Sequence, residues 1–86
     1  MDRNILKFFW GCGDDQIIQF ALIRAHLNKK ETEVLIGILD GCMTQEELAE
    51  QMRLSVRRVK KYWYSGADKL LNIPWVRAYS TALIYG

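Results

Sequence analysis

The sequence predicts an all-α fold, a single domain of four to five helices over residues 1–86. Two observations predict this class. Apolar residues recur at intervals of three and four along most of the chain, which is the period of a helix with one buried face. Capping residues precede these runs, and turn-forming residues separate them. One Pro and no Ser- or Gly-rich linker favour a single domain.

The first two predicted helices are separated by a glycine-rich turn. An apolar patch over residues 5–10 ends at residues 11–13, Gly-Cys-Gly, so we expect a short helix followed by a turn. Asp14 or Asp15 can cap the next helix, because a short carboxylate accepts hydrogen bonds from free backbone N–H groups. That helix reaches about Leu27 and is apolar nearly all round, so we expect it to be central in the core.

A third helix is predicted over residues 29–39, where Asn28 is the cap and Asp40-Gly41 is the stop signal. A fourth helix begins at Thr44, which can form a capping box with Glu47. The Thr hydroxyl accepts a hydrogen bond from the Glu N–H, and the Glu side chain reaches back. The apolar face of this helix is formed by Leu48, Ala49 and Met52.

Residues 44–72 are predicted to be two helices joined by a tight turn at Arg53 and Leu54, with Ser55 as the cap of the second. Ala49 is a small residue where the two helix axes are expected to cross closely. One side of the second helix is apolar and should face the core: Val56, Val59, Trp63, Ala67 and Leu70. A helix pair of this kind with a basic outer face is typical of a DNA-binding helix-turn-helix.

The last predicted helix begins at Pro74, because Pro fits the first turn of a helix. Its apolar stripe consists of Trp75, Val76, Tyr79, Leu83 and Ile84. Large exposed apolar patches usually mark interfaces, so residues 74–86 predict a contact with a second copy of this chain, in a homodimer, or with a larger partner. The alternative is that this helix packs on the N-terminal patch, with Phe8, Phe9 and Trp10, and closes a monomeric core.

Charge is distributed unevenly along the chain. Residues 1–52 carry five basic and nine acidic residues, a net charge of −4, whereas residues 53–86 carry seven basic residues and one acid, a net charge of +6. The run from Arg53 to Lys61 contains five positive charges and no acid. Such a run predicts an anion-binding surface, with a solvated helix face as the alternative.

The candidate DNA-binding residues lie at the starts of the two helices and on the outer face of the second: Thr44, Ser55, Val56, Arg57, Arg58, Lys60 and Lys61. Arg57, Arg58 and Lys61 are expected to point outward, with Lys60 nearby. Guanidinium groups can bond guanine edges bidentately, and ammonium groups suit phosphates. The free N–H groups at the helix starts, with the Thr44 and Ser55 hydroxyls, can also hold phosphates.

Two segments resemble a known family. LNKKETEVL at residues 27–35 and TQEELAEQMRLS at residues 44–55, followed by Val59 and Lys69-Leu70, resemble region four of bacterial sigma factors over residues 27–71. The arrangement also resembles the DNA-binding domain of LuxR-type regulators, in which the helix after the base-reading helix is a dimer contact.

This resemblance implies that Val56, Arg57, Lys60 and Lys61 read bases. Every polar residue among them is basic, so no particular promoter sequence follows. A complete sigma factor also needs a second domain, for which this chain has no room. We therefore expect a sigma-like fold in a different regulator.

The expected function is that of a cytoplasmic transcription regulator or sigma-like factor that reads double-stranded DNA through the helix at residues 55–72 and uses no cofactor. One alternative is a protein-interaction module that contacts RNA polymerase or another regulator, and a further one is a small phage packaging subunit.

No nucleophile with a nearby base, no glycine-rich phosphate loop and no HExxH motif is present, so an enzyme is not expected. His26 is the one histidine, and a single histidine does not supply the three or four protein ligands that a zinc site needs. No apolar stretch reaches the ~20 residues of a membrane span.

Cysteines and aromatic residues give weaker indications. Cys12 and Cys42 form no CxxC motif and are expected to be buried and inert. The run Tyr62-Trp63-Tyr64 could stack on single-stranded nucleic acid. However, Trp63 falls on the core face of its helix, and only Tyr64 is expected to be exposed.

Overall fold

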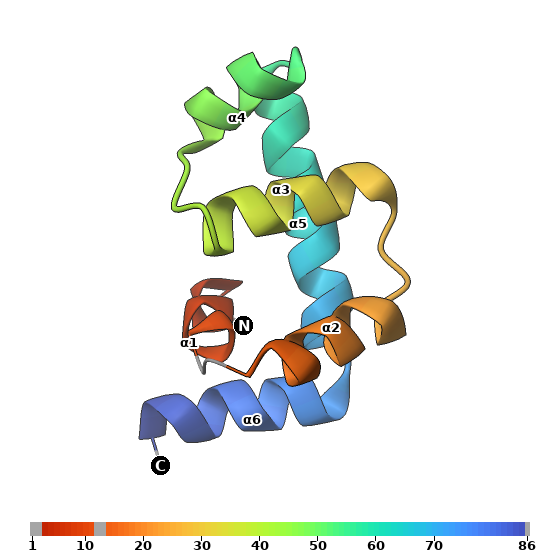
Figure 1. The fold of residues 1–86 in the computed structure, drawn as a ribbon, viewed down its shortest axis with the longest axis vertical. Helices are drawn as coiled ribbons and strands as arrows, with labels where there is room; N and C mark the ends of the chain where they lie inside the picture. The colour runs from red at the N-terminus through yellow and green to blue at the C-terminus, as the bar shows by residue number, and fades with distance from the viewer. Residues whose placement is uncertain (1–2, 12–13, 86) are drawn as a thin grey trace.

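The computed structural model describes residues 3–11 and 14–85, and all regular structure in them is helical (Figure 1). A 3-10 turn, η1 (Arg3–Ile5), precedes six α-helices: α1 (Leu6–Trp10), α2 (Asp15–Arg24), α3 (Lys29–Leu39), α4 (Gln45–Met52), α5 (Val56–Leu71) and α6 (Pro74–Tyr85). The all-α class is confirmed, and the described part of the chain has more helices than the four to five predicted. The expectations for Cys12 and Gly13 lie outside the described residues.

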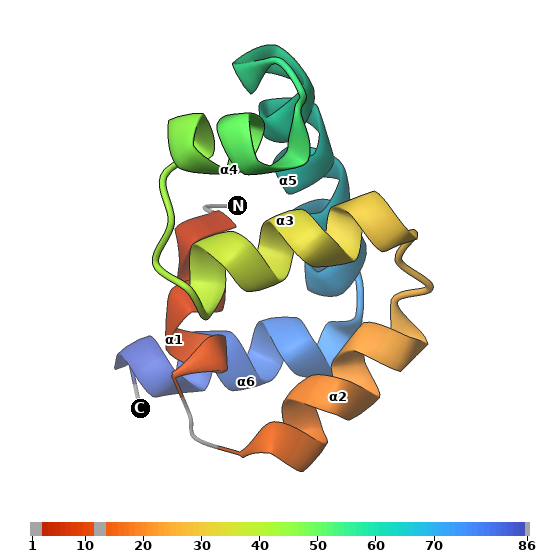
Figure 2. The same cartoon turned by 45° about the horizontal axis from the view of Figure 1, so that its top comes forward.

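The longest helix, α5, packs against α3, α4 and α6 (Figures 1 and 2). α3 and α4 cross α5 toward one end of the molecule. α6 begins just after the C-terminal end of α5 and packs on α1. The buried core is contributed mainly by α3, α5 and α1: Leu6, Phe9, Val34, Leu35, Val59, Trp63, Ala67, Leu70 and Leu71. Of the helices described, none is both long and apolar enough to cross a membrane.

Two glycines allow α3 to approach its neighbours closely. A Cβ atom added at Gly66 of α5 would lie 3.0 Å from Cδ1 of Leu35. One added at Gly37 of α3 would lie 2.5 Å from Cδ2 of Leu48 on α4. Both leucines are buried. The positions of α4 and α5 on α3 are therefore set by contacts that leave no room for larger residues.

The predicted helix caps are confirmed. Asp14, rather than Asp15, accepts hydrogen bonds from two backbone N–H groups in the first turn of α2. Asn28 and Thr44 each form a capping box with the glutamate three residues later. The Ser55 hydroxyl accepts a hydrogen bond from the N–H of Arg58 at 3.2 Å. These caps fix the starts of α2 to α5, because each satisfies a backbone donor that the helix itself cannot pair.

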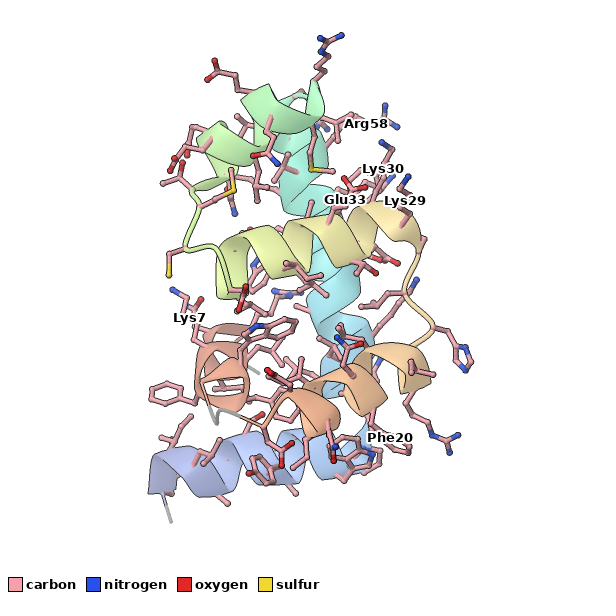
Figure 3. The ribbon with its side chains drawn as sticks, viewed as in Figure 1. Lys7, Phe20, Lys29, Lys30, Glu33 and Arg58 are labelled. Carbon is pink, nitrogen blue, oxygen red and sulfur yellow. The ribbon has the colours of Figure 1, made fainter. Side chains whose placement is uncertain are left out.

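The expectation that the second helix is central is wrong. α2 lies at the edge of the molecule beside α6, where the ring centroids of Phe20 and Trp75 are 5.9 Å apart (Figures 1 and 3). It buries only Ile18 and Ala21, whereas Phe20 is 60% and Ile23 is 72% exposed. A helix packed on one side can bury only one stripe of its apolar residues. The apolar residues around the whole circumference of α2 therefore do not place this helix in the centre of the core.

The predicted burial of Cys42 is also wrong. Cys42 is exposed in the connection between α3 and α4, where its φ is 52°. The following residue, Met43, packs against the core instead, and its N–H donates to the carbonyl of Gly37 at 2.9 Å. The connection runs over the surface, so only one of these neighbouring side chains points inward.

The N-terminal patch and the last helix pack on each other. Phe9 is fully buried, with its ring centroid 6.2 Å from that of Trp75 and 5.9 Å from that of Tyr79. Val76 and Ser80 form the buried stripe of α6, whereas Tyr79 and Leu83 of the predicted stripe remain exposed. Of the residues that predicted a dimer contact, Phe9 and Val76 therefore lie in the core of this chain, whereas Phe8, Tyr79 and Leu83 are exposed.

Candidate nucleic-acid interface

The connection between α4 and α5 is as short as predicted. Arg53 ends α4 in the left-handed conformation, with φ of 56° and ψ of 45°. The N–H of Leu54 then donates to the carbonyl of Ala49 at 2.9 Å, and Ser55 caps α5. Ala49 and Val59 are both buried in the core cluster. The chain thus reverses over three residues, and the first turns of α5 are fixed against α4.

The structure brings most of the predicted site residues together on the first turns of α5. Arg57, Arg58, Lys60 and Lys61 are all exposed, and four of the candidate residues line one shallow depression with Tyr64. Val56 is half-buried and packs against the core. Ser55 lies at the start of this group. Arginine and lysine side chains of one helix are therefore presented together on one outer surface.

Thr44 is separated from this group. It caps the first turn of α4, with its hydroxyl 3.1 Å from the N–H of Glu47. The eight residues of α4 span about 12 Å, so Thr44 lies a full helix length from the turn that leads into α5. A ligand that contacts both must extend along α4.

The positive charges between residues 53 and 61 have no acidic partners among the residues that the structure describes. The ion pairs in this part of the chain join Arg3 to Asp68 and Lys69 to Glu31. Neither involves any of the cations between residues 53 and 61. Their combined charge is therefore directed to solvent, which makes this the most positive exposed segment of the chain.

The aromatic run beside the basic surface offers little for base stacking. Trp63 is in the core, as predicted, and Tyr62 is half-buried. Tyr64 is exposed, as predicted, but the Arg3 guanidinium lies over its ring at 4.5 Å from the centroid. Asp68 holds Arg3 there through two hydrogen bonds of 2.9 and 3.0 Å. One face of the exposed ring is therefore already covered.

The start of α3 adds two basic residues that the sequence interpretation missed. Lys29 and Lys30 are exposed and line a second shallow depression together with Asn28 and Tyr62 of α5. Figure 3 shows both lysines on the same side of the molecule as Arg58. Their signal was the Lys29-Lys30 pair itself, which the net negative charge of residues 1–52 concealed.

A buried glutamate holds the start of α3 against α5. Glu31 is only 1% exposed, and its carboxylate accepts hydrogen bonds from the Ser65 hydroxyl and from Nζ of Lys69, the latter at 2.8 Å. It also accepts from the N–H of Asn28 at 3.0 Å. Burial raises the pKa of Glu31, but these hydrogen bonds lower it by more, so its pKa lies below the ordinary value.

The other hollows are not lined by clustered cations, and the one between α3 and α4 includes the acidic residues Glu33 and Asp40. Another lies between α2 and α6 and is lined largely by the rings of Phe20, Trp75 and Tyr79. Within residues 3–11 and 14–85, no group of three or more histidine, cysteine or acidic side chains lies close enough together to hold a metal ion. The basic surface on α5 and α3 is therefore the strongest candidate site.

Comparisons with known proteins found no match for this chain among protein-family models, curated proteins or solved structures. Inference about its function therefore starts from the geometry and charge of its own residues.

Proposed function

We propose that α4 and α5 form a helix-turn-helix and that the protein is a transcription regulator that binds duplex DNA through α5. The observation that carries this proposal is the exposed, acid-free group of four cations on the first two turns of α5. The resemblance of residues 27–71 to sigma region four supports it, and so does the short connection at Arg53–Ser55.

The shape of α5 fits the major groove. An α-helix with its side chains is about 10–12 Å across, and the major groove of B-DNA is about 12 Å wide. Arg57 and Lys61 are four residues apart and so lie on one face of α5, from which Arg57 can reach base edges and Lys61 a flanking phosphate. Arg57 and Arg58 carry the planar donors that pair with guanine, while Lys60 and Lys61 suit phosphates. The Ser55 hydroxyl and the N–H groups at the start of α5 add a further phosphate contact.

Duplex DNA is favoured over two other partners. Single-stranded nucleic acid is usually bound by stacking on exposed aromatic rings, and here Trp63 is buried and Tyr64 is covered by Arg3 on one face. A docking surface for RNA polymerase or another regulator would be expected to have an apolar centre. The outer face of α5 has instead basic side chains, whose charge complements phosphate.

The test is selection from a random duplex pool, followed by titration of the selected duplex over a range of salt concentrations. The expected slope of log K against log salt is negative, with about −0.9 for each phosphate neutralised. The double variant Arg57→Gln/Lys61→Gln should lower the magnitude of this slope. The matched control is Lys7→Gln/Arg24→Gln, which removes two exposed charges from other helices.

Absence of binding at low salt, or binding that is indifferent to salt, would contradict the proposal. Equal affinity for the duplex and for polyglutamate of the same charge would also contradict it, because the surface would then be suited to acidic proteins.

A further inference from the structure

We propose that the start of α3 is a second DNA contact, in which Lys29 and Lys30 hold the phosphate backbone beside the groove that α5 enters. This inference rests on the proposed function and deepens it. It assigns a DNA-contacting role to two residues outside the predicted helix pair.

The first step is the position of α3 relative to α5. Tyr62, Ser65 and Lys69 are spaced three and four residues apart, so they form one strip along α5. Ser65 and Lys69 bond Glu31, and Tyr62 shares a depression with Lys29 and Lys30. The start of α3 therefore lies against this strip.

The second step is that the same strip begins in the basic surface. Arg58 precedes Tyr62 by four residues, about 6 Å along the helix axis. The two lysines of α3 thus lie beside α5 one turn further along from its exposed cations, so the two groups form one basic surface. Figure 3 shows Arg58, Lys29 and Lys30 on the same side of the molecule.

The third step is what the lysines can reach. One helix fills the width of the major groove, so a second helix packed on its flank cannot enter the groove. It must lie at the edge, where the phosphates are. Lysine is a flexible point charge without the planar donors that read guanine, so contacts from Lys29 and Lys30 should be independent of sequence.

The fourth step is that these lysines are poorly placed for the stability of α3. They occupy its first turn, where the helix dipole is positive and acidic residues are preferred. Among the described residues, no acid forms an ion pair with either lysine. This includes Glu33, which lies one turn further along α3. A charge that breaks a local rule without a compensating contact points to a functional role.

The inference is tested with the full chain and the double variant Lys29→Gln/Lys30→Gln. Binding is measured against salt on the duplex selected from the random pool and on a duplex of unrelated sequence. We expect the slope to decrease in magnitude by about 1.8 on both duplexes, since each phosphate contributes about 0.9. The melting temperature should stay the same or rise, because two unfavourable charges leave the start of α3.

Lys7→Gln/Arg24→Gln is the matched control, and Arg57→Gln/Lys61→Gln is the positive reference. An unchanged slope in the Lys29/Lys30 variant, alongside a reduced slope in the Arg57/Lys61 variant, would overturn this inference and leave the proposed function standing. An equal reduction in the control would overturn it as well, because net charge alone would then explain the effect. A wild-type chain that binds neither duplex would overturn both proposals.

Discussion

The two ends of the molecule are built on different principles. At the end formed by α3, α4 and the start of α5, exposed basic side chains gather on the first turns of α3 and α5, and a buried glutamate and two glycines fix the helices beneath them. At the end formed by α1, α2 and α6, aromatic rings form the packing, and several large apolar side chains remain exposed. Charge is thus presented where the backbone is most tightly constrained, and apolar surface is left where helices pack on one side only.

Removal of the central ring of the apolar end should give the largest effect on stability. Phe9→Ala deletes a fully buried side chain that contacts Trp75 and Tyr79, and we expect a loss of about 3–5 kcal/mol of unfolding free energy. Phe8→Ala is the matched control, because Phe8 is exposed. Urea titration measures both. Equal stability of the two variants would show that the N-terminal patch is not part of the core.

The next effect concerns the basic end and should appear in binding. Arg57→Ala and Arg58→Ala should each weaken binding to a selected duplex by on the order of 1–3 kcal/mol and relax its sequence preference at one position. Lys60→Ala should weaken binding to all duplexes alike. Lys7→Ala, at the opposite side of the molecule in Figure 3, is the control. If folded variants at all three positions bind as the wild type does, α5 is not the base-reading helix.

The third effect is on the pH dependence of stability at the basic end, where Glu31 lies. We expect the ionised Glu31 carboxylate to contribute about 1–3 kcal/mol of unfolding free energy. Its pKa is lowered in the folded state, so the ionised carboxylate stabilises the fold at pH values above its unfolded pKa. That stability is lost as the pH falls through the lower, folded pKa. Glu31→Gln should therefore be less stable than wild type at neutral pH, with a difference that shrinks in acid.

Glu33→Gln serves as the control for the pH effect, since Glu33 is exposed on the same helix. Denaturant titrations at a series of pH values measure both variants. A difference between Glu31→Gln and wild type that stays constant down to strongly acidic pH would show that the carboxylate does not hold α3 in place.

The smallest expected effect is on self-association at the apolar end. The proposed homodimer would use the part of α6 that the core leaves exposed, including Leu83 and Tyr85. Leu83→Lys should weaken it by on the order of 1 kcal/mol, whereas Ile36→Lys, exposed on α3, should not. Sedimentation equilibrium measures the change. A wild-type chain that is strictly monomeric at high micromolar concentration excludes the homodimer.

Local signals predicted the helices well. The caps at Asn28, Thr44 and Ser55 act over three residues and depend on side-chain chemistry alone, so they could be found without knowledge of the fold. The buried strip of α5 was also predictable, because its apolar residues follow the helical period. Trp63 was placed correctly for this reason.

Properties that depend on how helices meet were not predictable from the same signals. The apolar composition of α2 does not reveal that only one of its sides is packed, so the exposure of Phe20 was missed. Exposure of Cys42 follows from the path of a surface connection. Lys29 and Lys30 join the basic surface because α3 packs on α5, where Glu31 bonds residues 34 and 38 positions further along the chain. No local pattern connects residues at that separation.

The close contact of Leu35 with Gly66 has a thermodynamic consequence for recognition. Because Leu35 packs directly on Gly66, the backbones of α3 and α5, which carry these cations, have a fixed separation before any ligand binds. Association with a polyanion then requires little ordering of the backbone, so the loss of conformational entropy should be small. Calorimetry should give a modest heat-capacity change, without the large negative value of segments that fold on binding. Affinity would be driven mainly by counterion release, and the protein would bind as a rigid body.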